Sequence, residues 1–230
     1  TRQDEKIVRK FDSFVVLTEE DKGYWGELPN IETIPNAAIT TEASRSDCTA
    51  HRVIAVGRLD YQKGFDRLIE AWSIVKEDSE YSDWQLDIFG QGEWKDMLER
   101  MIQEKGLGDS AHINRPTNDI WNEYARSSML VMSSHFEGLP MVLIEAMTCG
   151  LPAVTFDFKC GPKDIIEDGK NGLLVPEGNV QALAEAMKRL MYDEPLRRRM
   201  GTEALKIKEK YSEDAVMDKW LKLFEKLAND

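Results

Sequence analysis

From residue 51 to residue 192 the chain alternates short apolar runs with longer amphipathic stretches. The apolar runs predict strands at residues 51–57, 84–90, 111–114, 129–133, 152–156 and 172–175. The amphipathic stretches predict helices near residues 63–77, 92–105, 118–126, 140–149 and 179–192. Strands that alternate with helices form a parallel sheet, and nearly continuous apolar strands suit a sheet that is buried on both sides. The sequence therefore predicts an α/β fold, a parallel sheet with helices on both faces.

In a sheet of this kind, ligands bind at the carboxyl ends of the strands, near the point where the strand order reverses. The side chains that carry chemistry are therefore expected in the loops that follow the strands. The candidate binding loops come after Gly57, Gly90, Asn114, Ser134 and Phe156.

The first 50 residues do not join the alternation. Residues 13–18 predict one strand, residues 31–38 contain an Ile-Pro-Asn turn, and the polar residues 40–49 suit a loop or linker. A lone strand cannot bury both its faces. We therefore expect this strand either to join the main sheet or to be the remnant of a missing one.

The tail of the chain is helical. Residues 193–210 predict one helix, and residues 212–227 predict a second that begins at a Ser-Glu-Asp cap. Apolar side chains recur at helical spacing on the second helix, at Val216, Trp220, Leu223, Phe224 and Leu227. This stripe is expected to pack against the core, and a surface for a partner is the alternative.

Composition narrows the class of protein. With 230 residues, of which 42% are hydrophobic and 31% charged, the chain can bury a core without disulfides. The net charge of −12 argues against non-specific nucleic-acid binding, and it means that an anionic ligand needs a local cluster of cations. Cys48, Cys149 and Cys160 form no C-x-x-C pair and are expected to be reduced thiols of a cytoplasmic protein. No apolar run approaches the ~20 residues of a membrane span.

Two cations lie in the loop after the first strand of the alternating region. Arg58 and Lys63 follow Gly57, which ends the strand and permits the close approach of a ligand. A guanidinium fork and a mobile ammonium group could together neutralise a diphosphate. The alternative is a surface loop with two solvated charges.

The stretch from residue 134 to residue 147 places a Gly-Leu-Pro turn between two acids, Glu137 and Glu145. Pro140 suits the first position of a helix, so the N–H groups of Gly138 and Leu139 would form an anion site at its N-terminus. Carboxylates repel an anion but accept hydrogen bonds from hydroxyl groups beside it. A nucleotide sugar has a diphosphate with hydroxyl groups on both flanks. The alternative is a helix start that has two acids by chance.

Several other chemistries lack their motifs. The Gly90-Gln91-Gly92 turn has no third glycine, so we expect no nicotinamide cofactor, and there is no P-loop. No D-x-D pair occurs that could hold a divalent ion against a diphosphate. The three histidines have no metal-ligand spacing; only one of them, His135, lies close to a candidate acid.

Five motifs together resemble the donor-binding half of the retaining glycosyltransferases of family 4, the group 1 enzymes of the GT-B fold with its two Rossmann domains. The motifs, in chain order, are Val56-Gly57-Arg58-Leu59 with Lys63-Gly64, Phe89-Gly90-Gln91-Gly92, the E-x7-E run from Glu137 to Glu145, Gly161-Pro162-Lys163-Asp164-Ile165-Ile166, and Gly169-Lys170-Asn171-Gly172-Leu173-Leu174-Val175. The resemblance covers about residues 51–210. Arg115 stands where the family more often has Gly, and Phe158-Lys159-Cys160 is unusual before Gly161.

The resemblance implies a role for each candidate residue. Three residues would be catalytic: Arg58 and Lys63 would hold the donor diphosphate, and Glu137 would face the donor hexose. The substrate-binding residues would be Gly57 beside the diphosphate, Pro116 and Thr117 at the base, Gly138 and Leu139 through their N–H groups, and Glu145 at the ribose hydroxyls.

The resemblance also implies three segments within a Rossmann-like C-terminal half of a GT-B fold. Residues 1–50 would be a remnant of the N-terminal acceptor domain and the linker, residues 51–210 the nucleotide-sugar domain, and residues 211–230 a helix that crosses to the missing domain. Such a chain would bind the donor but would not transfer sugar efficiently alone.

The implied reaction transfers a hexose from a nucleotide-diphosphate sugar, expected to be a UDP-hexose, to a glycan or glycolipid acceptor with retention. No metal or other cofactor is expected, and the full-length protein would be cytoplasmic or peripheral to the inner face of the membrane. A nucleotide-sugar epimerase, a phosphorylase of the same fold and a non-catalytic nucleotide-sugar-binding module remain as alternatives.

Overall fold

A six-stranded parallel sheet with the strand order β5-β4-β3-β6-β7-β8 forms the centre of the computed structural model, which describes residues 2–39 and 45–229. Its strands are β3 (Arg52–Val56), β4 (Gln85–Phe89), β5 (Ala111–Asn114), β6 (Met129–Met132), β7 (Ala153–Asp157) and β8 (Gly172–Pro176). The chain adds β4 and β5 on one side of β3 and then returns to place β6 on the other side. The order therefore reverses between β3 and β6.

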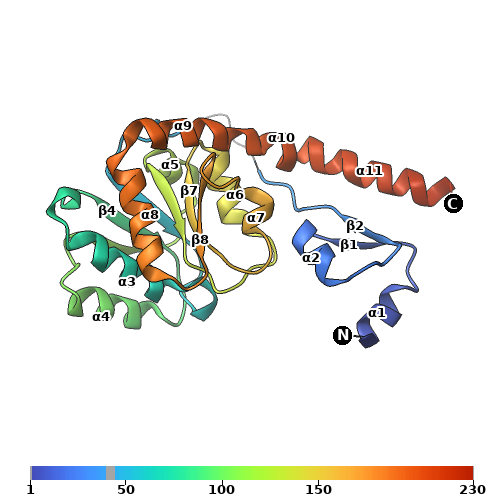
Figure 1. The fold of residues 1–230 in the computed structure, drawn as a ribbon, viewed down its shortest axis with the longest axis horizontal. Helices are drawn as coiled ribbons and strands as arrows, with labels where there is room; N and C mark the ends of the chain where they lie inside the picture. Colours follow the sequence, from blue (N-terminus) through green and yellow to red (C-terminus); the bar gives the residue numbers. More distant parts are fainter. Residues whose placement is uncertain (1, 40–44, 230) are drawn as a thin grey trace.

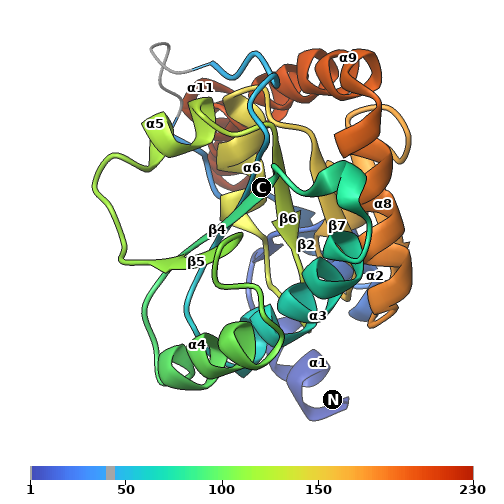
Figure 2. The ribbon, with the colours of Figure 1, turned by 90° about the vertical axis from the view of Figure 1, so that its left-hand side faces the viewer.

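Helices cover both faces of this sheet (Figure 2). They are α3 (Phe65–Lys76), α4 (Lys95–Glu104), α5 (Ile120–Ala125), α6 (Met141–Thr148), α7 (Pro162–Ile165) and α8 (Val180–Tyr192). The α3 helix packs beside α4 and α8 on one face, whereas α5 and α6 lie on the other. The predicted fold class is confirmed. Every strand and helix predicted between residues 51 and 192 is present, with ends that differ by at most three residues.

The N-terminal residues form a second, smaller sheet (Figure 1). Its elements are α1 (Arg2–Val8), β1 (Phe14–Val16), α2 (Glu19–Tyr24) and β2 (Ile31–Thr33), and β1 pairs with β2 in parallel. The strand predicted at residues 13–18 thus does not join the main sheet. The sequence analysis missed β2, because it is three residues long and ends next to a proline-containing turn.

The tail contains α9 (Glu194–Ala204), α10 (Lys208–Tyr211) and α11 (Glu213–Asn229). One helix was predicted over residues 193–210, but a 3-10 turn (Leu205–Ile207) separates α9 from α10. The α11 helix runs back along the β2 segment, where Val216 and Leu223 pack against Ile34. Trp220 packs half-buried beside them, whereas the Phe224 side chain is 56% exposed. None of the helices in the described ranges is both long enough and apolar enough to cross a membrane.

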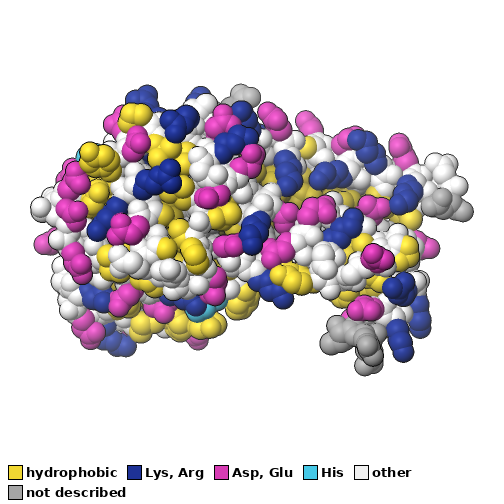
Figure 3. All heavy atoms as spheres, viewed as in Figure 1, with side chains coloured by type: hydrophobic (Ala, Val, Ile, Leu, Met, Phe, Trp, Pro, Cys, Tyr) yellow, Lys and Arg dark blue, Asp and Glu magenta, His cyan; other side chains and the backbone are white. Residues whose placement is uncertain are grey.

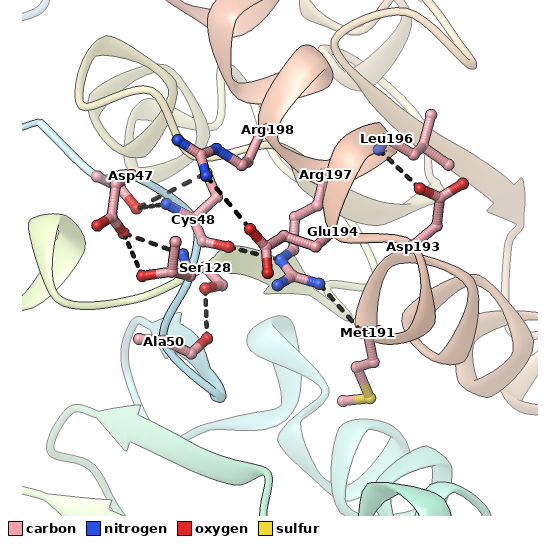
Figure 4. Close-up of polar contacts among 12 residues, drawn as sticks. Asp47, Cys48, Ala50, Ser128, Met191, Asp193, Glu194, Leu196, Arg197 and Arg198 are labelled. Atoms are coloured by element: carbon pink, nitrogen blue, oxygen red, sulfur yellow. Dashed lines mark hydrogen bonds and ion pairs between the residues drawn. The ribbon is translucent and has the colours of Figure 1, made fainter.

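A buried arginine joins the segment before β3 to the tail (Figure 4). The Arg197 guanidinium donates hydrogen bonds to three carbonyl oxygens: Cys48 at 2.8 Å, Leu190 at 2.5 Å and Met191 at 3.1 Å. It lies over the ring of Trp84, 5.0 Å from the centroid. Burial lowers the pKa of Arg197, yet an arginine stays charged in a protein, and the three carbonyls satisfy most of its donors.

Candidate functional site

The predicted site residues converge where the strand order reverses. A cavity of about 350 Å³ opens beyond the carboxyl ends of β3, β4 and β5, and helices α5 and α6 close its side. Five of the predicted residues line it: Gly57, Arg58, Pro116, Thr117 and Glu145. The other four lie in the loops after β3 and β6, outside the lining of this cavity.

Gly64 allows the loops after β3 and β6 to approach one another, and Gly57 leaves space for a side chain within the first of these loops. Gly64 has φ of 59°, and a Cβ atom there would lie 2.4 Å from the carbonyl oxygen of Ser133. A Cβ atom on Gly57 would meet the methylene groups of Lys63 at 3.0 Å. Gly57 therefore leaves room for the Lys63 side chain, a more specific role than the general access for a ligand predicted from the sequence.

Lys63 and Glu137 form an ion pair between these two loops. The Lys63 Nζ atom lies 2.6 Å from Glu137 Oε1, and the side chains are only 14% and 9% exposed. Ser134 Oγ donates to the same carboxylate oxygen at 2.8 Å, and Gln62 Nε2 donates to the other at 3.2 Å. Both oxygens of Glu137 are thus held by donors, which fixes the position of the carboxylate.

Gln62 is a site residue that sequence reasoning missed. Its Oε1 atom accepts a hydrogen bond from Arg58 Nη2 at 2.6 Å, while its Nε2 atom donates to the Phe136 carbonyl at 3.1 Å as well as to Glu137. Arg58 is otherwise 67% exposed and pairs with Asp60 at 3.2 Å. Gln62 therefore links the cation of one loop to the acid of the other. Only its position between Arg58 and Lys63 could have signalled this role.

Helix α6 begins one residue later than predicted. Pro140 was expected at the first helical position, but its ψ of 83° is not helical, and it is the N-cap residue. Its carbonyl accepts the first helical hydrogen bonds, from Leu143 at 3.0 Å and Ile144 at 3.4 Å. Pro140 packs against the backbone of Gly161, where a Cβ atom would lie 2.4 Å from its ring, and this contact sets the chain direction. No described residue accepts a hydrogen bond from the N–H groups of Gly138 or Leu139.

Glu145 lies on α6 and contributes to the wall of the cavity. Burial raises the pKa of its carboxyl group, and the nearby Tyr124 hydroxyl lowers it in part. Sequence reasoning also missed Tyr124, which lines the same cavity from α5. A lone tyrosine on a short amphipathic helix reads as an ordinary core residue, so no sequence signal marked it.

His135 contacts an aromatic ring and an arginine. His135 stacks on Tyr61 with ring centroids 4.1 Å apart, and its Nδ1 atom lies 2.6 Å from Arg67 Nη2. Burial and Arg67 lower the pKa of His135, so the ring is neutral at pH 7 and packs as an arginine partner. Within residues 2–39 and 45–229, no three His, Cys, Asp or Glu side chains are grouped so as to hold a metal ion.

Two larger hollows lie away from the carboxyl ends of the central strands. One, of about 720 Å³, lies between α7, α10 and α11, and the other, of about 760 Å³, lies beside α4 and β5. The first is lined by lysines and by nearly as many acids, and Figure 3 shows cations and anions interspersed in this part of the surface. The charges of the first hollow nearly cancel, and the second is lined by three acids and one arginine, so neither offers a cluster of unopposed cations for an anion.

The parallel sheet with its site at the reversal of strand order is that of a GT-B glycosyltransferase domain. A family model described as glycosyl transferases group 1 matches residues 39–207. The chain belongs to the group 1 glycosyl transferases.

The named relatives include a phosphotransferase and a glycosyltransferase. An exopolysaccharide phosphotransferase of Streptomyces coelicolor is 37% identical over 224 residues, which cover 95% of this chain and 24% of that protein. The amylovoran biosynthesis glycosyltransferase AmsD of Erwinia amylovora is 35% identical, over 91% of this chain and 61% of that protein. The chain thus spans less than two thirds of the length of either relative.

Solved structures give the same result. A structure of Staphylococcus aureus TarM, a mutant in complex with fondaparinux, alpha-GlcNAc-glycerol and UDP, matches with a TM-score of 0.85 at 30% identity. The match covers 97% of this chain and 46% of that one.

Proposed function

We propose that this chain provides the donor site of a retaining hexosyltransferase of family 4, which takes a hexose from a UDP-hexose. The observation that carries the proposal is the cavity at the end of β3, which Glu145 and Arg58 both line. A carboxylate suits the hydroxyl groups of a ribose, and a cation suits the adjoining diphosphate. The Lys63–Glu137 pair lies in the neighbouring loops, where the sugar would follow.

In this proposal the residues share the task of stabilising the departing nucleoside diphosphate. Arg58 and Lys63 supply positive charge, and the free N–H groups of Gly138 and Leu139 supply dipoles that need no reorganisation during the reaction. Glu137, held by Lys63, Ser134 and Gln62, accepts a hydrogen bond from a hexose hydroxyl. Pro116 and Thr117 contact the base. No step in this scheme requires a metal ion.

The relatives support the choice of donor and acceptor class. The TarM structure contains UDP, and a pneumococcal O-GlcNAc transferase, GtfA, 25% identical over 99% of this chain with a TM-score of 0.84, was solved with UDP and GlcNAc. AmsD acts in polysaccharide biosynthesis by its name. We infer a glycan or glycolipid acceptor, held by another part of a cytoplasmic or peripheral protein. No described feature favours an epimerase, a phosphorylase or a non-catalytic module.

The test is calorimetric titration of the chain with UDP, GDP and ADP, each with magnesium and with a chelator. We expect saturable binding of UDP that the chelator does not change and that Glu145→Ala abolishes. Glu185→Ala, an acid on the exposed face of α8, is the matched control and should bind as the wild type does. Absence of binding to all three nucleotides, or undiminished binding by Glu145→Ala, would contradict the proposal.

A further inference from the structure

Gln62 is held between the loops after β3 and β6 by its backbone as well as by its side chain. It lies in a 3-10 turn (Tyr61–Lys63) whose N-cap residue is Asp60, and its carbonyl oxygen accepts a hydrogen bond from the His135 N–H group at 2.8 Å. The residue is half-buried. The backbone contacts therefore fix the point from which the Gln62 side chain extends.

The partners of the Gln62 amide determine which way it faces. An arginine can only donate hydrogen bonds, so the amide oxygen Oε1 faces Arg58, whose Nη2 atom lies 2.6 Å away. A backbone carbonyl and a carboxylate accept hydrogen bonds, so Nε2 faces the Phe136 carbonyl at 3.1 Å and Glu137 Oε2 at 3.2 Å. The opposite orientation of the amide would break all three hydrogen bonds. Gln62 therefore joins a cation on one loop to an acid on the other in a single orientation.

The Arg58 side chain needs such a contact to stay in place. It is 67% exposed, and its ion pair with Asp60 is longer, at 3.2 Å. A long exposed side chain adopts many rotamers, and a ligand that binds it must pay the entropy of fixing one of them. The hydrogen bond from Arg58 to Gln62 fixes the guanidinium before a ligand arrives. Because Gln62 also holds one oxygen of Glu137 while Lys63 holds the other, the cation and the acid keep a fixed separation.

We propose that Gln62 is a positioning residue of the donor site, whose amide orients the Arg58 guanidinium toward the donor diphosphate and keeps it in register with Glu137 at the hexose. Gln62 contacts no part of the donor itself and acts through Arg58. Its effect on the binding of a diphosphate must therefore disappear when Arg58 is absent. This inference rests on the proposed function.

The experiment is a double-mutant cycle between Gln62 and Arg58, in which NMR titration with UDP also measures weak binding. Gln62→Met keeps the length of the side chain and removes its hydrogen-bonding groups. We expect this change to raise the Kd for UDP by about 5–10-fold in the wild type, the usual effect of one hydrogen bond, but by less than about twofold in Arg58→Ala. Gln181→Met, which removes an exposed glutamine contact on α8, is the matched control and should leave both Kd values unchanged.

A second readout needs no nucleotide. Rotation of the Arg58 guanidinium about its Nε–Cζ bond, followed by NMR of the Nη atoms and assigned with Arg58→Ala, should be faster in Gln62→Met than in the wild type, because the variant loses the partner of Nη2. The guanidinium of Arg52, which forms ion pairs with Asp87 and Glu123, is the internal reference. Its rotation should not change, which shows that the variant is folded.

The outcomes separate the two proposals. An equal loss of UDP affinity in the wild type and in Arg58→Ala would assign Gln62 a merely structural role and would overturn the inference. Unchanged UDP affinity in Gln62→Met, or unchanged rotation of the Arg58 guanidinium, would also overturn it. If the wild type bound no UDP, the proposed function itself would fail, while the rotation would still decide whether Gln62 fixes Arg58.

Discussion

At the scale of single residues, the proposed chemistry depends most on Arg58 and Lys63, two cations in one loop. In the complete enzyme, Arg58→Ala or Lys63→Ala should lower kcat/KM by at least ~100-fold, because each removes a preorganised positive group from the leaving diphosphate. Steady-state kinetics with the UDP-hexose donor measures the effect. Lys95→Ala, which removes a cation of an exposed ion pair on α4, is the control. Near-wild-type turnover by the Arg58 and Lys63 variants would contradict their roles.

Glu145 illustrates a conflict between function and stability at the same scale. Its pKa is raised by burial, so the folded state binds its proton more tightly than the unfolded state. The charged carboxylate therefore destabilises the fold above that pKa, and the cost disappears as the pH falls through it. We expect Glu145→Gln to have a higher Tm than the wild type at pH 8, with a difference that shrinks toward pH 5, and to bind UDP poorly. Calorimetric melting at both pH values tests this; a lower Tm for Glu145→Gln at pH 8 would be the contrary result.

At the scale of elements, the contact between the loops after β3 and β6 depends on Gly64. Gly64→Ala places a side chain at a positive φ and drives its Cβ atom against the Ser133 carbonyl, so we expect a loss of at least about 2 kcal/mol in the free energy of unfolding. Gly106→Ala is the matched control, because Gly106 has φ of 67° but open space around it, and it should cost about 1 kcal/mol. Urea unfolding measures both. Equal losses would show that the loop contact contributes nothing beyond the backbone strain.

At the scale of the whole molecule, the question is whether this chain alone can transfer a sugar. The chain spans less than two thirds of the relatives described above, and the acceptor site is proposed to lie elsewhere in the protein. We therefore expect this chain to bind the nucleotide sugar without transferring the hexose efficiently to an added acceptor. A transfer assay with a labelled donor compares it with the full-length protein, and robust transfer by the chain alone would refute the expectation.

Local patterns in the sequence were enough to predict the layers of the main sheet and the loops that hold the candidate site. Periodicity and apolar runs are local properties, so the strands and helices between residues 51 and 192 could be read from them to within three residues. The same locality placed Arg58 and Lys63 in a loop at a strand end and Glu145 on the helix that follows another strand. It also explains the failures: β2 is too short to show a period, and the start of α6 depends on the contact of Pro140 with Gly161.

Which of these residues contact one another depends on the tertiary structure. Lys63 and Glu137 lie 74 positions apart, and they pair because the strand order places β6 beside β3. Neither Gln62 nor Tyr124 belongs to a sequence motif. Gln62 contacts Glu137, which is distant in the chain, and Tyr124 lines the cavity together with residues that are distant in the chain. Strand order and helix packing result from the burial of the whole core, which no short stretch of sequence encodes. The chemistry of the site was therefore visible residue by residue, while its geometry arose only when the sheet was assembled.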